Sequence, residues 1–262
     1  MKKIQHAAAQ SAGKICVAMA IALSAPVYAQ TDGSSIQPHA EKLLRNMSDF
    51  LGKQQSFSVT TENSLEVVLT SGQKIQYTSP ASLQLKRPNL LRASRKGDLV
   101  DQEFYYDGKT LTLFSPGNGF YATTAAPATI DQTLDMARET LDIIAPGGDF
   151  IYTNSYAMLT QDVTSGFYVG KAVVGGVTCD HLAFRGKDVD WQIWIAEGNK
   201  PLPKKYVITS KRVPGEPQFT VDINGWNLAP RFSNTSFSFK PPKNATRIDF
   251  LRMTTDAESA KR

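Results

Sequence analysis

The spacing of apolar residues predicts one amphipathic helix followed by a long series of strands. In residues 38–51 the apolar positions follow the i, i+3, i+4, i+7 pattern of a helix. They are Ala40, Leu43, Leu44, Met47, Phe50 and Leu51. Pro38 suits the first helical turn, and Gly52 suits the end of the helix. From residue 57 onward the pattern changes to an alternation of period two, which is typical of half-buried strands.

The predicted strands fall into two groups. The first group covers 57–60, 65–69, 74–78, 82–86, 90–94, 99–106, 109–114 and 120–124, and the second covers 166–174, 177–185, 190–196, 204–212, 218–226 and 236–240. Asp107–Gly108 and Gly175–Gly176 predict two-residue hairpin turns, the former of type I′. These short, hairpin-connected segments predict one antiparallel sheet.

A helical insertion is expected at residues 127–159, between the two groups of strands. Residues 127–144 carry an apolar stripe and a capping Thr129. The stripe consists of Ile130, Leu134, Ala137 and Leu141. Residues 150–159 follow as an apolar segment that predicts a second, short helix, with Tyr152 and Tyr156 at helical spacing.

Two apolar helical segments need an apolar sheet face to cover. The expected fold is therefore α+β and mostly β, with a large curved antiparallel sheet that forms an incomplete β-barrel. The N-terminal helix and the central insertion would cover its concave face. No linker or repeat divides residues 30–253, which predicts a single domain, and residues 254–262 predict a disordered tail.

The N-terminal residues 1–29 have the pattern of a cleavable secretory signal peptide. Lys2, Lys3 and Lys14 precede an apolar run over 15–23, which is shorter than the roughly 20 residues that span a bilayer. Cleavage is predicted after Ala29, which favours the periplasm of a Gram-negative bacterium. Cys16 lies inside the apolar run and follows a lysine, so a lipid anchor is not expected. A short buried helix is the alternative interpretation.

The charge and cysteine content of the mature chain exclude some classes of protein. The formal charge of +5 falls to +2 once the three lysines of the signal are removed. This small excess argues against a nucleic-acid-binding protein. Cys179 is then the only cysteine, so no internal disulfide can form, and no further segment approaches transmembrane length.

Several segments resemble a family of predicted periplasmic proteins of unknown function. They are KRPNLLR, FYYDGKTLTLFSP, YATTAAPATID, VTCDHLAFR, DWQIWI and PLPKKYVIT, which begin at Lys86, Phe104, Tyr121, Val177, Asp190 and Pro201. The resemblance covers nearly the whole mature chain. It implies a fold like that of the periplasmic lipoprotein carriers and their outer-membrane acceptors. These are incomplete barrels with a hydrophobic cavity, but no carrier motif transfers to a numbered residue here.

Groups for metal binding or catalysis are scarce. His39, His181 and Cys179 are the only histidines and cysteine of the mature chain, and Cys179 and His181 would share one face of a strand. Two such ligands are too few for structural zinc. A catalytic Cys179–His181 pair would need a third, orienting group. The sequence therefore predicts no enzyme, no metal and no cofactor.

Aromatic and aliphatic residues are the remaining candidates for a binding site. The residues expected to line a cavity or its lid are Tyr106, Leu134, Leu141, Phe150, Tyr152, Tyr156, Trp191 and Trp194. Ordinary core packing is the alternative for all of them. The leading hypothesis is a binding protein for an acyl chain, a lipid or a lipoprotein tail. The alternative is an envelope scaffold with a self-filled core that binds a protein partner.

Overall fold

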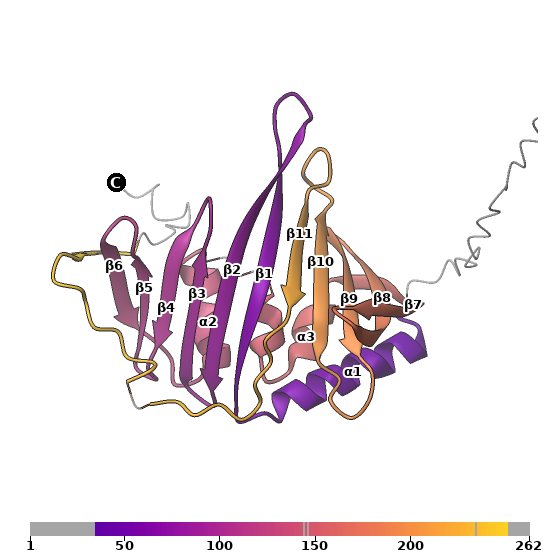
Figure 1. Cartoon of the computed structure of the whole chain (residues 1–262), viewed down its shortest axis with the longest axis horizontal. Helices are drawn as coiled ribbons and strands as arrows, with labels where there is room; N and C mark the ends of the chain where they lie inside the picture. Colours follow the sequence, from indigo (N-terminus) through magenta and orange to yellow (C-terminus); the bar gives the residue numbers. More distant parts are fainter. Residues whose placement is uncertain (1–34, 144, 146, 234, 251–262) are drawn as a thin grey trace, which may run out of the picture. The chain divides into compact units, whose positions relative to one another are not determined.

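One open sheet of twelve strands dominates the structure. The structure is a computed structural model that describes residues 35–143, 145, 147–233 and 235–250. The strand order is β12-β6-β5-β4-β3-β2-β1-β11-β10-β9-β8-β7, and in Figure 1 the sheet extends from β6 on the left to β7 on the right. The predicted signal peptide and C-terminal tail lie outside the described residues.

The described part of the chain contains twelve strands and four helical segments. The strands are β1 Ser56–Val68, β2 Lys74–Lys86, β3 Leu90–Lys96, β4 Asp101–Tyr106, β5 Thr110–Ser115, β6 Phe120–Ala125, β7 Val163–Val174, β8 Val177–Gly186, β9 Val189–Ala196, β10 Pro203–Ser210, β11 Gln218–Ile223 and β12 Thr246–Ile248. The helices are α1 Pro38–Gly52, α2 Ile130–Thr140, the 3-10 helix η1 Gly148–Ile151 and α3 Ser155–Thr160. This mostly β architecture with helical cover confirms the predicted fold class.

The two predicted groups of strands join into one sheet through β1. Strands β1 to β6 form a meander, β7 to β11 form a second one, and β1 pairs with β11 over Thr61–Leu65. All neighbours run antiparallel except β12, which lies parallel to β6. The segment between β11 and β12 follows the lower edge of the sheet in Figure 1, so the chain returns to the β6 edge without another hairpin.

The two predicted hairpin turns differ in outcome. Gly175 and Gly176 have φ values of 55° and 78° between the paired Val174 and Val177, so this two-residue turn is confirmed. The type I′ prediction for Asp107–Gly108 is wrong. A type I′ turn needs positive φ at both positions, and of these two residues only Gly108 has it. The Asp107 carboxylate instead accepts the backbone N–H groups of Lys109 and Thr110.

The predicted strand at 236–240 is also wrong. These residues form a turn and an extended segment in which Phe237 is buried. The ring of Phe239 packs against Tyr105, Phe114 and Tyr121, with centroid distances of 5.2–5.3 Å. These three residues point away from the face that holds the core, so Phe239 packs across the convex side of the sheet instead of joining a strand ladder.

The helices begin and end for local reasons. Pro38 starts α1 at its first turn, and the Thr129 hydroxyl caps α2 by accepting the N–H of Gln132 at 3.3 Å. The predicted second helix is split, because Tyr152 is extended and the Asn154 side chain starts α3 by accepting the N–H of Ala157. No helix within the described ranges is long and apolar enough to cross a membrane.

Candidate functional site

The concave face of the sheet is the candidate site, and strand alternation decides which side chains reach it. In β9, Trp191, Ile193 and Ile195 are buried, whereas the intervening Gln192 and Trp194 are not. Ile193 lies opposite Leu182 on β8 and Tyr206 on β10, so the same buried face continues across the neighbouring strands. The concave face of this half is therefore a continuous apolar layer.

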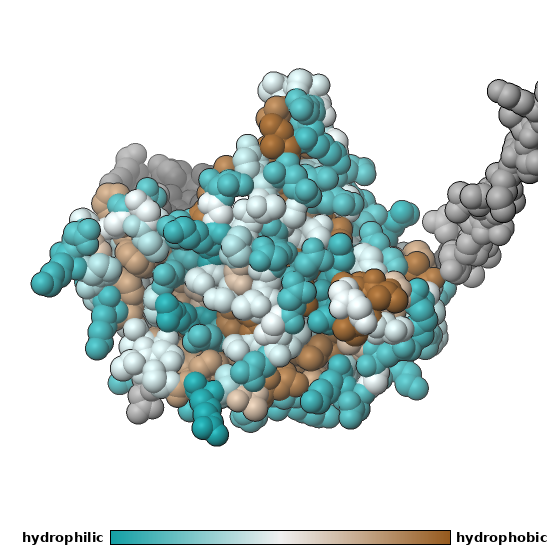
Figure 2. Space-filling view, in the orientation of Figure 1, coloured by the Kyte–Doolittle hydropathy of each residue, from teal (hydrophilic) through white to brown (hydrophobic). Residues whose placement is uncertain are grey.

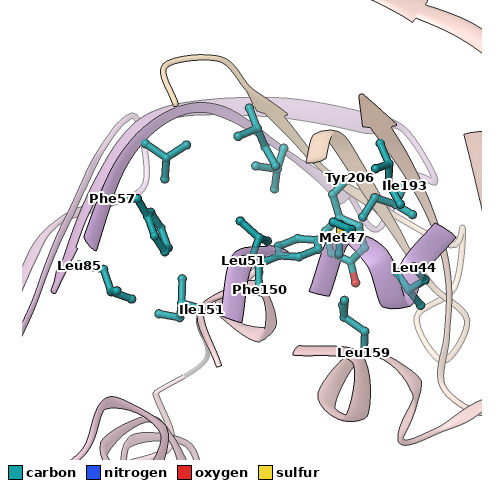
Figure 3. Packing of buried hydrophobic residues seen from close by; sticks show 14 of the residues in the cluster. Leu44, Met47, Leu51, Phe57, Leu85, Phe150, Ile151, Leu159, Ile193 and Tyr206 are labelled. Atoms are coloured by element: carbon teal, nitrogen blue, oxygen red, sulfur yellow. The ribbon is translucent and has the colours of Figure 1, made fainter. Parts of the chain in front are cut away.

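The helices fill the space in front of this layer with apolar side chains. Leu44, Met47 and Leu51 of α1 have no exposed surface. Figure 3 shows them between the arching strands and the segment that holds Phe150, Ile151 and Leu159. The centre of the concave face is thus occupied by the chain's own residues.

Buried polar contacts hold α3 and η1 against the rest of the molecule. The Ser48 hydroxyl of α1 accepts the hydroxyl of Ser155 at 2.8 Å and the backbone N–H of Tyr156 at 2.7 Å. The Arg87 guanidinium donates to the Ile151 carbonyl at 2.9 Å and to the Thr153 hydroxyl at 3.2 Å. Hydrogen bonds between buried groups fix the register of a packed segment, so these contacts orient the helical cover.

Helix α2 is attached to the same segment through its acidic residues. The Asp131 carboxylate accepts the backbone N–H of Thr153 at 3.1 Å and lies 3.9 Å from the Arg87 guanidinium. Asp135 accepts the Tyr152 hydroxyl at 2.9 Å. Burial is the main cause that raises the pKa of Tyr152 above its usual range, and the bond to Asp135 adds to it. The three helical segments of the insertion therefore form one connected cover.

The predicted cavity residues do not all lie together. Tyr106, Phe150, Tyr152 and Trp191 are buried, and Leu134, Leu141 and Tyr156 lie partly buried against the core. Trp194 points to the convex face, where it stacks on His181 at 4.0 Å. The Tyr206 ring connects Phe150 and Trp191, at 4.9 and 5.7 Å. Ligand contact by these residues stays a prediction.

Arg95 is a further candidate that alternation alone could have indicated. It follows Leu91 and Ala93 at intervals of two, so it faces the concave side of β3, where an apolar residue is expected. Its guanidinium is partly buried, and this burial lowers its pKa. No ion pair or side-chain hydrogen bond partners it among the described residues. A concave-face cation without a protein counter-charge is a candidate for anion binding.

The residues that could support catalysis are not paired with one another. The buried thiol of Cys179 donates to the Val177 carbonyl at 3.4 Å, and burial raises its pKa. The His181 imidazole pairs with the Gln192 side chain at 3.0 Å, and burial lowers its pKa. Within the described part of the chain, no group of three or more His, Cys, Asp or Glu residues is placed to hold a metal ion.

Several solved structures are similar to this chain at low sequence identity. An uncharacterized conserved protein from Thermus thermophilus is 10% identical, with a TM-score of 0.48, over 80% of this chain and 99% of its own. LprF from Mycobacterium bovis is 13% identical, with a TM-score of 0.46, over 80% and 99%. A LolA superfamily protein from Nitrosomonas europaea is 12% identical, with a TM-score of 0.37, over 76% and 97%.

The sequence itself assigns the chain to a family. None of the curated protein sequences is similar to it. The family model described as "Predicted periplasmic protein (DUF2092)" matches residues 40–251, which include every helix and strand from β1 to β12 and most of α1. The resemblance noted from the sequence is thereby confirmed. The chain belongs to the DUF2092 family of predicted periplasmic proteins.

Proposed function

We propose that this chain is a non-catalytic binding protein of the periplasm that holds an amphiphile with an apolar chain and an acidic head group. The proposed site is the part of the concave face on β2 to β5, beside the filled core. The observation that carries the proposal is Arg95, a partly buried cation with no protein counter-charge among the described residues. An acidic head group would supply the missing charge.

The residues beside Arg95 are polar. Arg95 lies between Ala81 of β2 and Gln102 of β4, and Ala81 in turn lies opposite Thr61 of β1. All four positions are only partly buried. The Gln102 side chain can donate a further hydrogen bond to a phosphate or carboxylate, whereas the Thr61 hydroxyl already donates to Asn63 at 3.0 Å. This cross-strand row therefore suits a head group.

The adjoining row on the same face is apolar. Leu83, Ala93, Phe104 and Leu113 lie side by side across β2, β3, β4 and β5. All four are only partly buried, so a further apolar group can still cover them. Each CH₂ group that a ligand buries there contributes about 0.8 kcal/mol. A polar row beside an apolar row matches the two ends of an amphiphile.

Binding of dodecyl phosphate, followed by native mass spectrometry and by calorimetry, tests the proposal. The variant Arg95→Gln removes the cation, and Arg92→Gln is the matched control because Arg92 faces the convex side of the same strand and pairs with Glu103. Loss of the charge-assisted contact is expected to weaken binding about ten- to hundredfold in Arg95→Gln only. Equal affinity in the two variants, or equal binding of dodecanol by the unmodified protein, would contradict the proposal.

A protein-binding role is the second candidate, favoured by a specific observation. The centre of the concave face is filled by the chain's own helices, and the edge strand β7 exposes Phe167 at 41% and Val173 at 71%. A sheet edge with exposed apolar side chains can pair with a strand of another chain. Residues 35–37 already bond to this edge beside Phe167, so the proposed pairing is with the part of β7 that carries Val173. The substitution Val173→Lys would block such pairing while leaving dodecyl phosphate binding unchanged, which separates the two candidates.

A further inference from the structure

A small cleft lies at the end of the filled core, apart from Arg95. Its volume is about 220 Å³, and it opens between α3, η1 and the turn from β8 to β9. Trp191 and Tyr206 form its apolar wall, together with Leu159. The Trp191 indole is held in place by stacking on Phe184 at 4.0 Å. The cleft therefore has a rigid aromatic wall.

Asp149 of η1 is an acidic residue that lines this cleft. Burial raises the pKa of Asp149, and the nearby Arg138 only partly offsets this effect. Within the described ranges no ion pair joins the Asp149 carboxylate to a basic side chain. Arg138 instead pairs with Asp135 at 3.1 Å. The ionised carboxyl group thus lacks a direct counter-charge.

Tyr206 supplies a second polar group on the same wall. Its side chain is 4% exposed, and its ring is fixed between Phe150 and Trp191. Burial is the main cause that raises the pKa of its hydroxyl, and the charge of Asp149 adds to it. Both residues line the same cleft. No side chain or backbone group among the described residues hydrogen-bonds this hydroxyl. It is therefore available to a ligand.

We propose that this cleft binds a primary ammonium group carried on an apolar stem, with the ammonium on Asp149 and Tyr206 and the stem against Trp191. A carboxylate and a phenolic oxygen both accept hydrogen bonds from an ammonium group, which has three donors. This site and its ligand are independent of the amphiphile proposed for Arg95.

The charges at the rim of the cleft do not favour an anion. Lys187 and Asp188 come from the same turn, and Asp188 pairs with Arg212. Asp162 and Lys187 are both exposed and opposite in sign. The rim is thus close to neutral, whereas the inner carboxyl group is the buried charge. Arg138 also lines the cleft but pairs with Asp135, so the charge without an ion pair inside the cleft is the inner carboxylate, which attracts a cation.

The volume of the cleft limits the size of the stem. It corresponds to about seven water molecules in the liquid, at roughly 30 Å³ each. A chain of four or five methylene groups with one ammonium group fits this space. A lysine side chain and a free diamine both carry that group, and the two sources can be separated by experiment.

Calorimetric titration with 1,5-diaminopentane and with Nα-acetyl-lysine methylamide tests the proposal on the whole chain. We expect a dissociation constant of about 1 mM or tighter for at least one of them. Tighter binding of the lysine derivative identifies a peptide ligand, and tighter binding of the diamine identifies a free amine. Pentan-1-ol has a similar stem without the charge. If it binds as tightly as the amines, or if neither amine binds, the proposal is wrong.

Variants locate the site. Asp149→Asn keeps the shape of the side chain and is expected to weaken amine binding about ten- to hundredfold, the loss typical of a charge-assisted hydrogen bond. Asp98→Asn, in the exposed turn between β3 and β4 and outside the lining of the cleft, is the matched control and should bind like the unmodified protein. Arg138→Gln removes the competing cation and should strengthen binding, so a result remains if Asp149→Asn does not fold. Unchanged affinity in both Asp149→Asn and Arg138→Gln would overturn the assignment.

Discussion

Both halves of the sheet present apolar side chains to the same concave side and both contain core residues, but one row on β3 to β5 is only partly covered. On β8 to β10, the inward-facing Leu182 and Ile193 have no exposed surface, and Tyr206 is 4% exposed. On β3 to β5, Ala93, Phe104 and Leu113 occupy equivalent inward positions but remain partly exposed. Alternation along a strand therefore fixes the direction of a side chain, and the helices that pack in front of it decide whether it becomes core.

The helical cover explains the difference. Figure 3 shows α1 and the α3 segment on the side where Ile193 and Tyr206 lie. Figure 2 shows one area of apolar exposure near the tip of the β1–β2 hairpin, and Leu65 and Leu69 are exposed in this hairpin. The partly exposed row on β3 to β5 is therefore a surface where a ligand could complete the core.

Matched truncations on the two halves provide the largest expected effect. Ile193→Ala should lower the free energy of unfolding by about 2–5 kcal/mol, because it leaves a cavity among fully packed side chains. Leu113→Ala should cost roughly 1 kcal/mol, because less of its surface is removed from water. Urea denaturation of both variants measures the difference. Equal losses would show that the β5 side is as tightly packed as the β9 side.

A disulfide that links the helical cover to α1 tests the same comparison between the two halves. The Ser48 and Ser155 hydroxyls lie 2.8 Å apart and are separated by 107 positions in the chain, so Ser48→Cys combined with Ser155→Cys is a candidate disulfide. We expect a stabilisation of about 2–4 kcal/mol under oxidising conditions, measured by thermal unfolding with and without reductant. Affinity for dodecyl phosphate should not change, because the proposed site lies beside the cover. Lost affinity in the oxidised form alone would place the ligand beneath the cover.

The smallest expected effect concerns the buried carboxyl group of Asp149. The pKa of Asp149 is raised in the folded chain, so the folded state binds this proton more tightly than the unfolded state. Its contribution to stability is therefore present at low pH and is lost as the pH rises from the usual range of an aspartate through the raised pKa. Asp149→Asn should gain on the order of 1 kcal/mol over the unmodified chain at pH 7.

Thermal unfolding of both proteins between pH 3 and pH 8 measures this dependence. The difference between Asp149→Asn and the unmodified chain should widen with rising pH and then level off. Asp162→Asn serves as the control, because Asp162 is exposed and its removal should leave the pH profile unchanged. A difference that shrinks as the pH rises would mean that the Asp149 carboxylate is stabilised in the folded chain.

The sequence predicts local structure well where the signal is itself local. The i, i+3, i+4 spacing places α1, and the Thr129 cap and apolar stripe place α2, although α2 is shorter than the predicted 127–144. The Gly175–Gly176 turn is also local, since both residues need positive φ. The type I′ turn at Asp107 fails for an equally local reason, because the aspartate side chain bonds the following backbone instead.

Predictions that depend on distant neighbours succeed less often. Residues 236–240 have an alternating apolar pattern, but Phe239 packs on the convex side of strands that lie more than a hundred residues earlier in the chain. Two predicted strands at 57–60 and 65–69 are one strand, β1, because β2 and β11 pair along it. Trp194 is predicted near a cavity with Trp191, although residues three positions apart on a strand face opposite sides.

The amino-acid sequence by itself determines the element types, the mostly β composition and the apolar faces, because these follow from short-range periodicity and turn chemistry. Only the tertiary structure decides which apolar face is filled. It also decides that Arg95, whose side of the strand follows from alternation, has no counter-charge among the described residues, and that Asp149, Tyr206 and Trp191 meet in one cleft. The reason is physical: burial and charge pairing depend on which distant segments pack together, and no local pattern encodes that choice.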